Sequence, residues 1–189
     1  MTRIIAGFAG SRELKVPKEG TRPTSDRVRE ALFSSLDASD LIRGSRVLDL
    51  YAGTGALGLE ALSRGAKHVG LVENNPKAAK IIRSNARVVS NSGGKESGSF
   101  EVFKESVGSY LSRSRSLWNL ALIDPPYSVT NEELGLVLAT LSRQMTRDGV
   151  IVVERSVHDP LFTAPERMQI IRSKAYGDTI LVWLEIADY

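Results

Sequence analysis

The sequence predicts an α/β fold built on a mostly parallel, doubly wound sheet, and three observations support this. From residue 46 onward, short apolar runs typical of strands alternate with longer segments of helical periodicity. Chemically distinctive residues follow several of these runs, as expected where parallel strands end at a ligand site. The last two strand-like runs are separated by Gly177-Asp178, which indicates an antiparallel hairpin that closes the sheet.

Length and composition are those of an ordinary soluble globular protein. The chain has 189 residues, of which 42% are hydrophobic and 25% charged, and this length suffices for one well-filled core. No apolar stretch approaches the roughly 18 residues of a membrane span, and the N-terminus lacks a signal-peptide pattern, so we expect a cytoplasmic protein. The absence of cysteine excludes disulfides and cysteine nucleophiles, and with only two histidines we expect no metal site.

The first part of the chain is predicted to be a small extension of the main domain. Residues 3–16 alternate loosely between apolar and polar side chains and predict a hairpin. A loop punctuated by glycine and proline follows, and Thr24 or Ser25 can cap the helix that comes next. We therefore expect a basic N-terminal hairpin or arm over residues 1–24 and one main domain over residues 25–189.

The elements of the main domain follow one another as strand and helix in regular order. Strands are predicted at 46–50, 68–73, 99–104, 118–123, 149–154, 169–176 and 179–186. Helices are predicted at 56–64, 76–89, 106–113 and 132–145. Gly65 ends the first of these helices, and Asn74 or Asn75 caps the second. The polar, glycine-rich segment 91–98 is expected to form a loop.

Positive charge is concentrated near the N-terminus. The net charge is +3, and residues 1–29 carry seven basic and three acidic side chains, so the remaining chain is nearly neutral. A basic arm on a neutral body is typical of a nucleic-acid partner, although a solvated surface hairpin would show the same pattern. The basic residues expected to contact nucleic-acid phosphates are Arg3, Arg12, Lys15, Lys18, Arg22 and Arg29.

A glycine-rich loop joins the first strand of the main domain to its helix. Gly53, Gly55 and Gly58 match the dinucleotide fingerprint, and Glu73 lies 20 residues after Gly53. Asp49, however, stands just before the turn, where a carboxylate would repel a pyrophosphate and favour a cation. S-adenosylmethionine carries an ammonium and a sulfonium and no phosphate, so it fits this site better than a dinucleotide does. Glu73 can then accept hydrogen bonds from both ribose hydroxyls.

Further cofactor contacts are expected from neighbouring strand ends. The Ser106 hydroxyl could bond the adenine amine and the Val107 N–H a ring nitrogen, although Ser106 could equally cap the helix that follows. Arg27 is the candidate for binding the methionine carboxylate. The residues expected to bind the cofactor are Asp49, Tyr51, Ala52, Gly53, Gly55, Glu73, Asn74, Ser106, Val107 and Arg27.

The segment Asp124-Pro125-Pro126-Tyr127 follows a buried strand-like run and offers a rigid site for an amino group. Two prolines fix two φ angles and remove two N–H donors, so this turn presents carbonyl groups that are held still. The Asp124 carboxylate and the Pro125 carbonyl can accept hydrogen bonds from an amine while Tyr127 stacks on a flat ring. We expect these four residues to form a catalytic site for the exocyclic amine of a nucleobase, the alternative being an ordinary turn.

Together, these motifs resemble the class I S-adenosylmethionine-dependent methyltransferases that carry a D/N-P-P-Y/F motif and act on amino groups. The segments 3–7, 21–33 and 47–55 look like the bacterial 16S rRNA guanine-N2-methyltransferase D family, and the resemblance covers about residues 3–186. It implies a Rossmann-like methyltransferase fold, and methylation of N2 of the guanine at position 966 of 16S rRNA, with S-adenosyl-L-homocysteine as product. It also implies that the basic residues bind RNA, and that the partner is 16S rRNA within the small ribosomal subunit or an assembly intermediate. We expect the protein to be a monomer that binds no membrane.

Three other functions remain open. The same tetrapeptide serves DNA or RNA amino methyltransferases that act on adenine N6 or cytosine N4, although no separate target-recognition domain is visible. A dinucleotide-dependent oxidoreductase would use the glycine loop, and a non-catalytic rRNA-binding assembly factor would need only the basic arm. C5 methylation of cytosine by the usual thiolate route is excluded because the chain has no cysteine.

Overall fold

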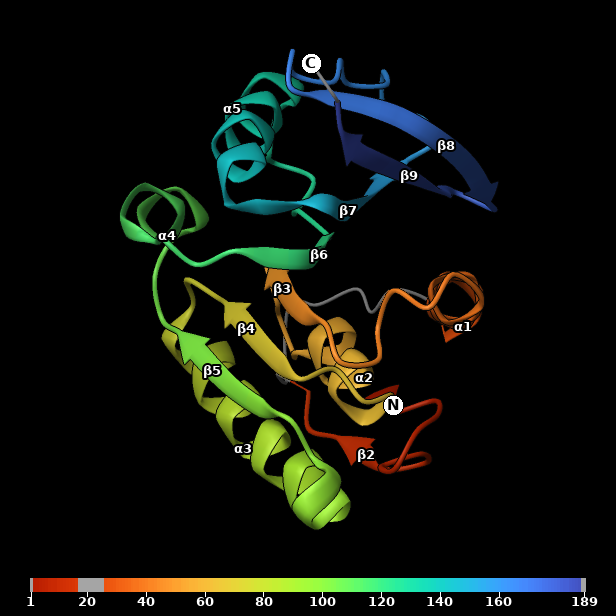
Figure 1. The fold of residues 1–189 in the computed structure, drawn as a ribbon, viewed down its shortest axis with the longest axis vertical. Helices are drawn as coiled ribbons and strands as arrows, with labels where there is room; N and C mark the ends of the chain where they lie inside the picture. Colours follow the sequence, from red (N-terminus) through yellow and green to blue (C-terminus); the bar gives the residue numbers. More distant parts are fainter. Residues whose placement is uncertain (1, 17–25, 188–189) are drawn as a thin grey trace.

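The computed structural model describes residues 2–16 and 26–187, and within them a seven-stranded sheet forms the centre of the molecule (Figure 1). Its spatial order is β5-β4-β3-β6-β7-β9-β8. The strands are β3 (Arg46–Leu50), β4 (His68–Val72), β5 (Ser99–Phe103), β6 (Trp118–Ile123), β7 (Met145–Ser156), β8 (Met168–Tyr176) and β9 (Thr179–Ile186). Neighbours from β5 to β7 pair in parallel, whereas β9 pairs antiparallel with both β7 and β8. The predicted parallel sheet with a C-terminal antiparallel hairpin is confirmed.

Helices cover both faces of this sheet. They are α1 (Asp26–Ala38), α2 (Ala56–Ser63), α3 (Pro76–Gly93), α4 (Val107–Arg113) and α5 (Asn131–Leu141), with short 3₁₀ turns η1 (Gly94–Glu96) and η2 (Ser142–Gln144). Among the described residues, Leu32, Leu59 and Ile82 join α1, α2 and α3 to one apolar core cluster. Tyr110 and Leu138 join α4 and α5 to a second cluster on the other face. Two packed faces make the sheet doubly wound, as predicted. None of the helices in the described parts of the chain combines the length and apolar character that crossing a membrane needs.

The N-terminal segment is a hairpin that shares the main core. Strand β1 (Thr2–Arg3) pairs antiparallel with β2 (Glu13–Leu14), and the ladder is only two residue pairs long. Ile4, Ala9 and Leu14 are buried in the same cluster as α1 and α2. The predicted boundary between residues 24 and 25, and the capping residues expected there, lie outside the described residues.

Two sequence expectations about element ends are wrong. The segment 91–98 is not a loop at its start, because α3 continues to Gly93 and η1 follows. The ring of Phe8 covers Gly93 so closely that an added Cβ would lie 2.7 Å from it, so packing stabilises a helix end that composition disfavours. The helix predicted to reach residue 145 ends earlier, because Met145 is buried and pairs with Trp118 as the first residue of β7.

Candidate active site

One large cleft lies where the carboxyl ends of β3, β4, β6 and β7 meet. Because these strands run in parallel, residues that follow them in the sequence gather at a single edge of the sheet. The cavity volume is about 1840 Å³, against roughly 300–1,000 Å³ for a pocket that holds one small ligand. The cleft therefore has room for a cofactor and for part of a second substrate.

Nearly all of the predicted catalytic and cofactor-binding residues line this cleft. They are Arg27, Asp49, Tyr51, Ala52, Gly53, Glu73, Asn74, Ser106, Val107, Asp124, Pro125, Pro126 and Tyr127. Gly55 is the exception among them. Its φ is +80°, and an added Cβ would lie 3.2–3.3 Å from the side chains of Leu59, Leu71 and Ile82. Gly55 thus serves the turn and the packing of α2 against the sheet.

Carboxylates near the ends of β3 and β4 hold the first turn of α2 and the glycine loop in place. The Gly58 N–H donates to Asp49 Oδ2 at 2.8 Å, and the Gly53 N–H donates to Glu73 Oε2 at 2.8 Å. Tyr51, which opens the loop, has a φ of +63°, a conformation that is uncommon and strained for a residue with a bulky side chain. The loop is therefore shaped by its neighbours on β3 and β4 rather than by local preference.

Asp49 is a buried carboxylate surrounded by negative charge. Its exposed fraction is 1%, and burial raises its pKa from 3.8 to about 8. The hydrogen bond from Gly58 opposes this rise in pKa, whereas the charges of Asp124 and Glu73 add to it. A phosphate at this point would meet three acidic side chains, whereas a cationic ligand would relieve their mutual repulsion. The electrostatics thus favour an ammonium or sulfonium group over a pyrophosphate.

Glu73 and the cap of α3 build the part of the cleft expected to hold the ribose. Glu73 Oε1 accepts from the Asn75 N–H at 2.7 Å. Because each carboxylate oxygen has two lone pairs, both oxygens of Glu73 retain capacity for a hydroxyl donor. Asn75, and not Asn74, caps α3 by accepting hydrogen bonds from Lys77 N and Ala78 N.

Ser106 has the capping role that the sequence left open. Its Oγ accepts a hydrogen bond from the Ser109 N–H at 3.2 Å and so caps α4. Ser106 also lines the edge of the cleft, where its hydroxyl hydrogen can turn towards an acceptor on a ligand. Its predicted contact with adenine stays a prediction.

The turn Asp124–Tyr127 presents an aromatic ring beside acidic groups. Pro125 is buried, while the Tyr127 side chain is 71% exposed and borders the cleft. The Val129 N–H donates to the Pro126 carbonyl at 2.9 Å and closes a turn over residues 126–129. Arg155 steadies the following segment, since its guanidinium donates to the Val129 carbonyl at 3.1 Å. An exposed ring on a braced turn is suited to stacking on an incoming base.

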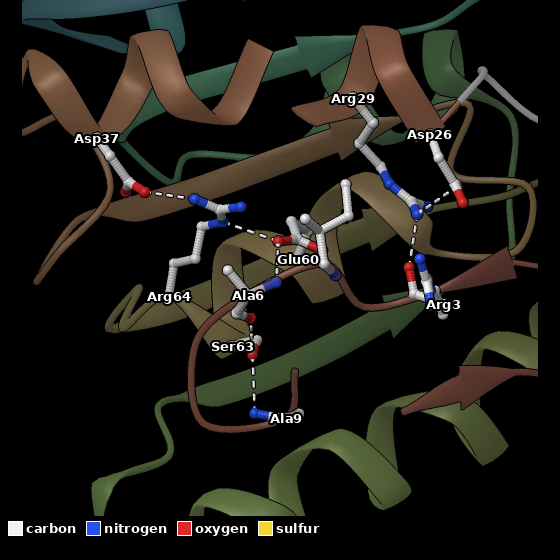
Figure 2. A network of polar contacts seen from close by, with 10 residues as sticks. Arg3, Ala6, Ala9, Asp26, Arg29, Asp37, Glu60, Ser63 and Arg64 are labelled. Atoms are coloured by element: carbon white, nitrogen blue, oxygen red, sulfur yellow. Dashed lines mark hydrogen bonds and ion pairs between the residues drawn. The ribbon is translucent and has the colours of Figure 1, made fainter. Parts of the chain in front are cut away.

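The structure corrects the expectation for Arg29 among the predicted RNA contacts. Arg29 is 1% exposed, and its Nη2 donates to the Arg3 carbonyl at 2.5 Å and to Asp26 Oδ1 at 2.9 Å (Figure 2). It therefore ties α1 to β1 instead of facing phosphates, and burial lowers its pKa below the usual arginine value. Arg3, Arg12 and Lys15 are exposed. Lys18 and Arg22 lie outside the described residues.

The C-terminal hairpin contributes a wall of the cleft that sequence reasoning missed. Gly177 and Thr179 of this hairpin line the cleft, together with Glu154 near the end of β7 and His158 just after it. Ser156 at the end of β7 pairs with Thr179 at the start of β9, so the antiparallel return places the turn at the active edge. The Gly177-Asp178 turn signal was visible in the sequence, but only the pairing with β7 shows where it lies.

The family model described as conserved hypothetical protein 95 matches residues 2–185. The chain belongs to this family. Ribosomal RNA small subunit methyltransferase D of Escherichia coli (strain K12) is 34% identical over 176 residues, which cover 93% of this chain and 85% of that protein. The putative rRNA methyltransferase YlbH of Bacillus subtilis (strain 168) is 32% identical over 181 residues, covering 94% of this chain and 95% of that one.

Solved structures agree with this family. Putative methyltransferase yhhF from Escherichia coli superposes with a TM-score of 0.83 at 29% identity, covering 98% of this chain and 97% of that one. Putative methylase HI0767 from Haemophilus influenzae gives 0.76 at 28% identity, covering 99% of each chain. The putative methyltransferase SMU.776, complexed with SAH, gives 0.65 over 85% of this chain and 48% of that one; its 13% identity shows a shared fold alone. The predicted Rossmann-like methyltransferase fold and the predicted family are thereby confirmed, and the protein is a methyltransferase.

Proposed function

We propose that this methyltransferase transfers a methyl group from S-adenosylmethionine to an exocyclic amine of a base in small-subunit rRNA, namely N2 of the guanine at position 966 of 16S rRNA. The observation that carries the proposal is the meeting of Asp49, Glu73 and Asp124 in one cleft beside the exposed ring of Tyr127. The curated relatives are named ribosomal RNA small subunit methyltransferases, and these names support rRNA as the polymer and the small ribosomal subunit as its location. The base and its position come from the family resemblance of the sequence.

The acidic half of the cleft fits S-adenosylmethionine. A buried carboxylate whose pKa is raised to about 8 by burial and by neighbouring acids is stabilised when a cation arrives. Asp49 would bind the positively charged methionine end of the cofactor, and Glu73 would accept hydrogen bonds from the ribose hydroxyls. Arg27 would bind the methionine carboxylate. Ser106 and Val107 would face the adenine. When bound, S-adenosylmethionine supplies an electrophilic methyl group.

The turn Asp124–Tyr127 would hold the acceptor base. The guanine amine is a weak nucleophile because its lone pair is delocalised into the ring, so its orientation matters more than early removal of a proton. The Asp124 carboxylate and the Pro125 carbonyl accept its N–H groups, and Tyr127 stacks on the flipped-out base, a contact worth about 1–3 kcal/mol. Positioning supplies most of the rate gain in this scheme.

The arm would hold the RNA backbone. Arg3, Arg12 and Lys15 are exposed cations on or beside the hairpin, and the predicted RNA contacts Lys18 and Arg22 belong to the same arm. Because neutralising a phosphate releases counterions, replacing Arg12 and Lys15 together by glutamine should weaken RNA binding. It should also lower the slope of log K against log salt by about 0.7–0.9 for each phosphate that is no longer neutralised. An unchanged salt slope would remove these two residues from the RNA interface.

Nucleoside mass mapping tests the proposal directly. Small subunits from cells that lack this protein are incubated with purified protein and S-adenosylmethionine, and the 16S rRNA is then digested and mapped. We expect N2-methylguanosine at position 966, better yield on particles than on naked RNA, and no product with Asp124→Ala. Thermal stabilisation by S-adenosylmethionine should survive in that variant.

Other products would point to the other functions. N6-methyladenine or N4-methylcytosine would indicate a different amino methyltransferase. Stabilisation by NAD(H) and not by S-adenosylmethionine would indicate an oxidoreductase. Full cellular activity of Asp124→Ala with no methylated product would indicate an assembly factor.

A further inference from the structure

Asn85 is a buried amide in the middle of α3 that touches two functional segments at once. Its exposed fraction is 2%. The side chain clamps the backbone of Lys15: Oδ1 accepts from the Lys15 N–H at 2.9 Å, and Nδ2 donates to the Lys15 carbonyl at 3.0 Å. The same Nδ2 donates to the Thr54 carbonyl at 3.1 Å. Both of its N–H groups are therefore used, one on each segment.

The two segments have different predicted tasks. Lys15 directly follows β2 in the basic arm, and its exposed side chain reaches Ser84 Oγ at 3.2 Å. Thr54 lies between Gly53 and Gly55, whose φ angles of +55° and +80° define the loop at the cofactor end of the cleft. One amide thus joins the backbone of an expected RNA contact to the backbone of the cofactor loop.

The rest of the arm is held by the helix that begins at this same loop. Glu60 on α2 accepts a hydrogen bond from Ile5 N at 2.7 Å. It also accepts one from Ala6 N at 3.0 Å, as Figure 2 shows. Ser63 accepts from Ala9 N at 3.0 Å and donates to the Ala6 carbonyl at 2.6 Å. These anchors fix residues 5–9 on α2. Asn85 differs from them because its one side chain bonds both the arm and the loop.

We propose that Asn85 is a positioning residue that couples RNA binding by the arm to cofactor binding by the glycine loop. The inference rests on the proposed function, in that the arm binds rRNA. When an RNA phosphate binds the Lys15 side chain, the position of the Lys15 backbone becomes fixed. The Asn85 amide, which bonds this backbone, then keeps the Thr54 carbonyl in the conformation that binds the cofactor. Coupling between two binding sites is reciprocal, so RNA and cofactor should each raise the affinity for the other by the same factor.

The test measures that coupling factor. Calorimetry gives the affinity for S-adenosylhomocysteine with and without a saturating 16S rRNA fragment. In the wild-type protein we expect the RNA to tighten binding about fivefold or more. Asn85→Asp keeps an acceptor for the Lys15 N–H but loses both donors, so its factor should fall to about one. Ser84→Ala, which removes only the partner of the Lys15 ammonium, should keep the wild-type factor.

A stability control separates coupling from general loosening. Ser63→Ala weakens the arm at α2 without touching Thr54, so it should lower thermal stability and keep the coupling factor. Hydrogen exchange on the unaltered protein provides a measurement that needs no variant to fold. The rRNA fragment alone should slow exchange in residues 53–55 as well as in the arm.

Specific results would overturn the inference. One such result is a coupling factor of one in the wild-type protein. Another is a folded Asn85→Asp protein with the wild-type coupling factor. A third is slower hydrogen exchange on RNA binding that is confined to residues 2–16. Failure of the proposed function would look different: the wild-type protein would then neither bind the rRNA fragment nor methylate small subunits.

Discussion

Two buried carboxylates near the glycine loop show how differently the protein treats the same chemical group. Asp49 lies in β3 and Glu60 in α2, and their exposed fractions are 1% and 0%. Glu60 accepts a hydrogen bond from Ile5 N. It also accepts one from Ala6 N and pairs with the Arg64 guanidinium at 2.7 Å (Figure 2). Within the described residues, Asp49 receives a hydrogen bond from Gly58 N and has acidic neighbours instead of a cation.

This difference in partners indicates that Glu60 has a structural role and that Asp49 binds a ligand. Burying a carboxylate is unfavourable unless hydrogen bonds and an opposite charge replace the lost water. Glu60 obtains both from the protein itself, so it stabilises the attachment of the arm. Asp49 does not, and burial raises its pKa to about 8, so its charge becomes favourable only when a cation enters the cleft. A shifted pKa and incomplete pairing thus mark the functional member of the pair.

Removing Glu60 should have the largest effect on the protein. Glu60→Ala leaves two buried N–H groups without an acceptor and leaves Arg64, whose side chain is 9% exposed, without this partner. We expect a loss of about 3–5 kcal/mol in the free energy of unfolding, measured with urea. The exposed Glu96 serves as the matched control, and Glu96→Ala should change stability by less than about 0.5 kcal/mol. Equal effects of the two substitutions would show that Glu60 does not hold the arm.

Replacing Asp49 should affect the ligand more than the fold. Asp49→Asn removes the charge but keeps an acceptor for Gly58, so the ligand-free protein should be as stable as wild type or more so. Affinity for S-adenosylmethionine should fall about 10- to 100-fold, the equivalent of one lost charged hydrogen bond. Calorimetry measures this loss of affinity. In the control Asp124→Asn, calorimetry should give the wild-type cofactor affinity, while a methylation assay should show that turnover is lost. Wild-type affinity in Asp49→Asn would place the cation elsewhere.

The third expected effect is on the pH dependence of stability. The pKa of Asp49 is raised by folding from 3.8 to about 8, so the folded protein binds this proton more tightly than the unfolded chain does. This contribution to stability is fully present below about pH 4 and is lost as the pH rises towards 8. The unfolding free energy of the ligand-free protein should therefore decline over that range, and decline less in Asp49→Asn. Parallel curves for the two proteins would mean that Asp49 is ionised at neutral pH.

The location of the candidate site was predictable because its residues lie at or near strand ends. Glu73 and Asp124 directly follow β4 and β6, and Asp49 is the last residue but one of β3. Parallel strands bring such residues together at one edge. The anchors of the arm were not predictable. Glu60 and Asn85 act on partners 54 to 70 residues away in the sequence, and no local pattern reports such a pairing. Arg29 was misassigned for the same reason, since charge alone does not show which face of α1 is covered.

By itself, the sequence determined the order of strands and helices, the acidic glycine loop and the rigid turn at Asp124–Tyr127. Periodicity, chain breakers and the chemistry of short motifs act over a few residues, so they can be recognised from the sequence alone. Only the tertiary structure decided that Glu60 is satisfied while Asp49 is not, that the hairpin around Gly177 borders the cleft, and that Asn85 joins arm to loop. Burial and long-range hydrogen bonds set the energy of a polar group, and both exist only once distant segments have packed together.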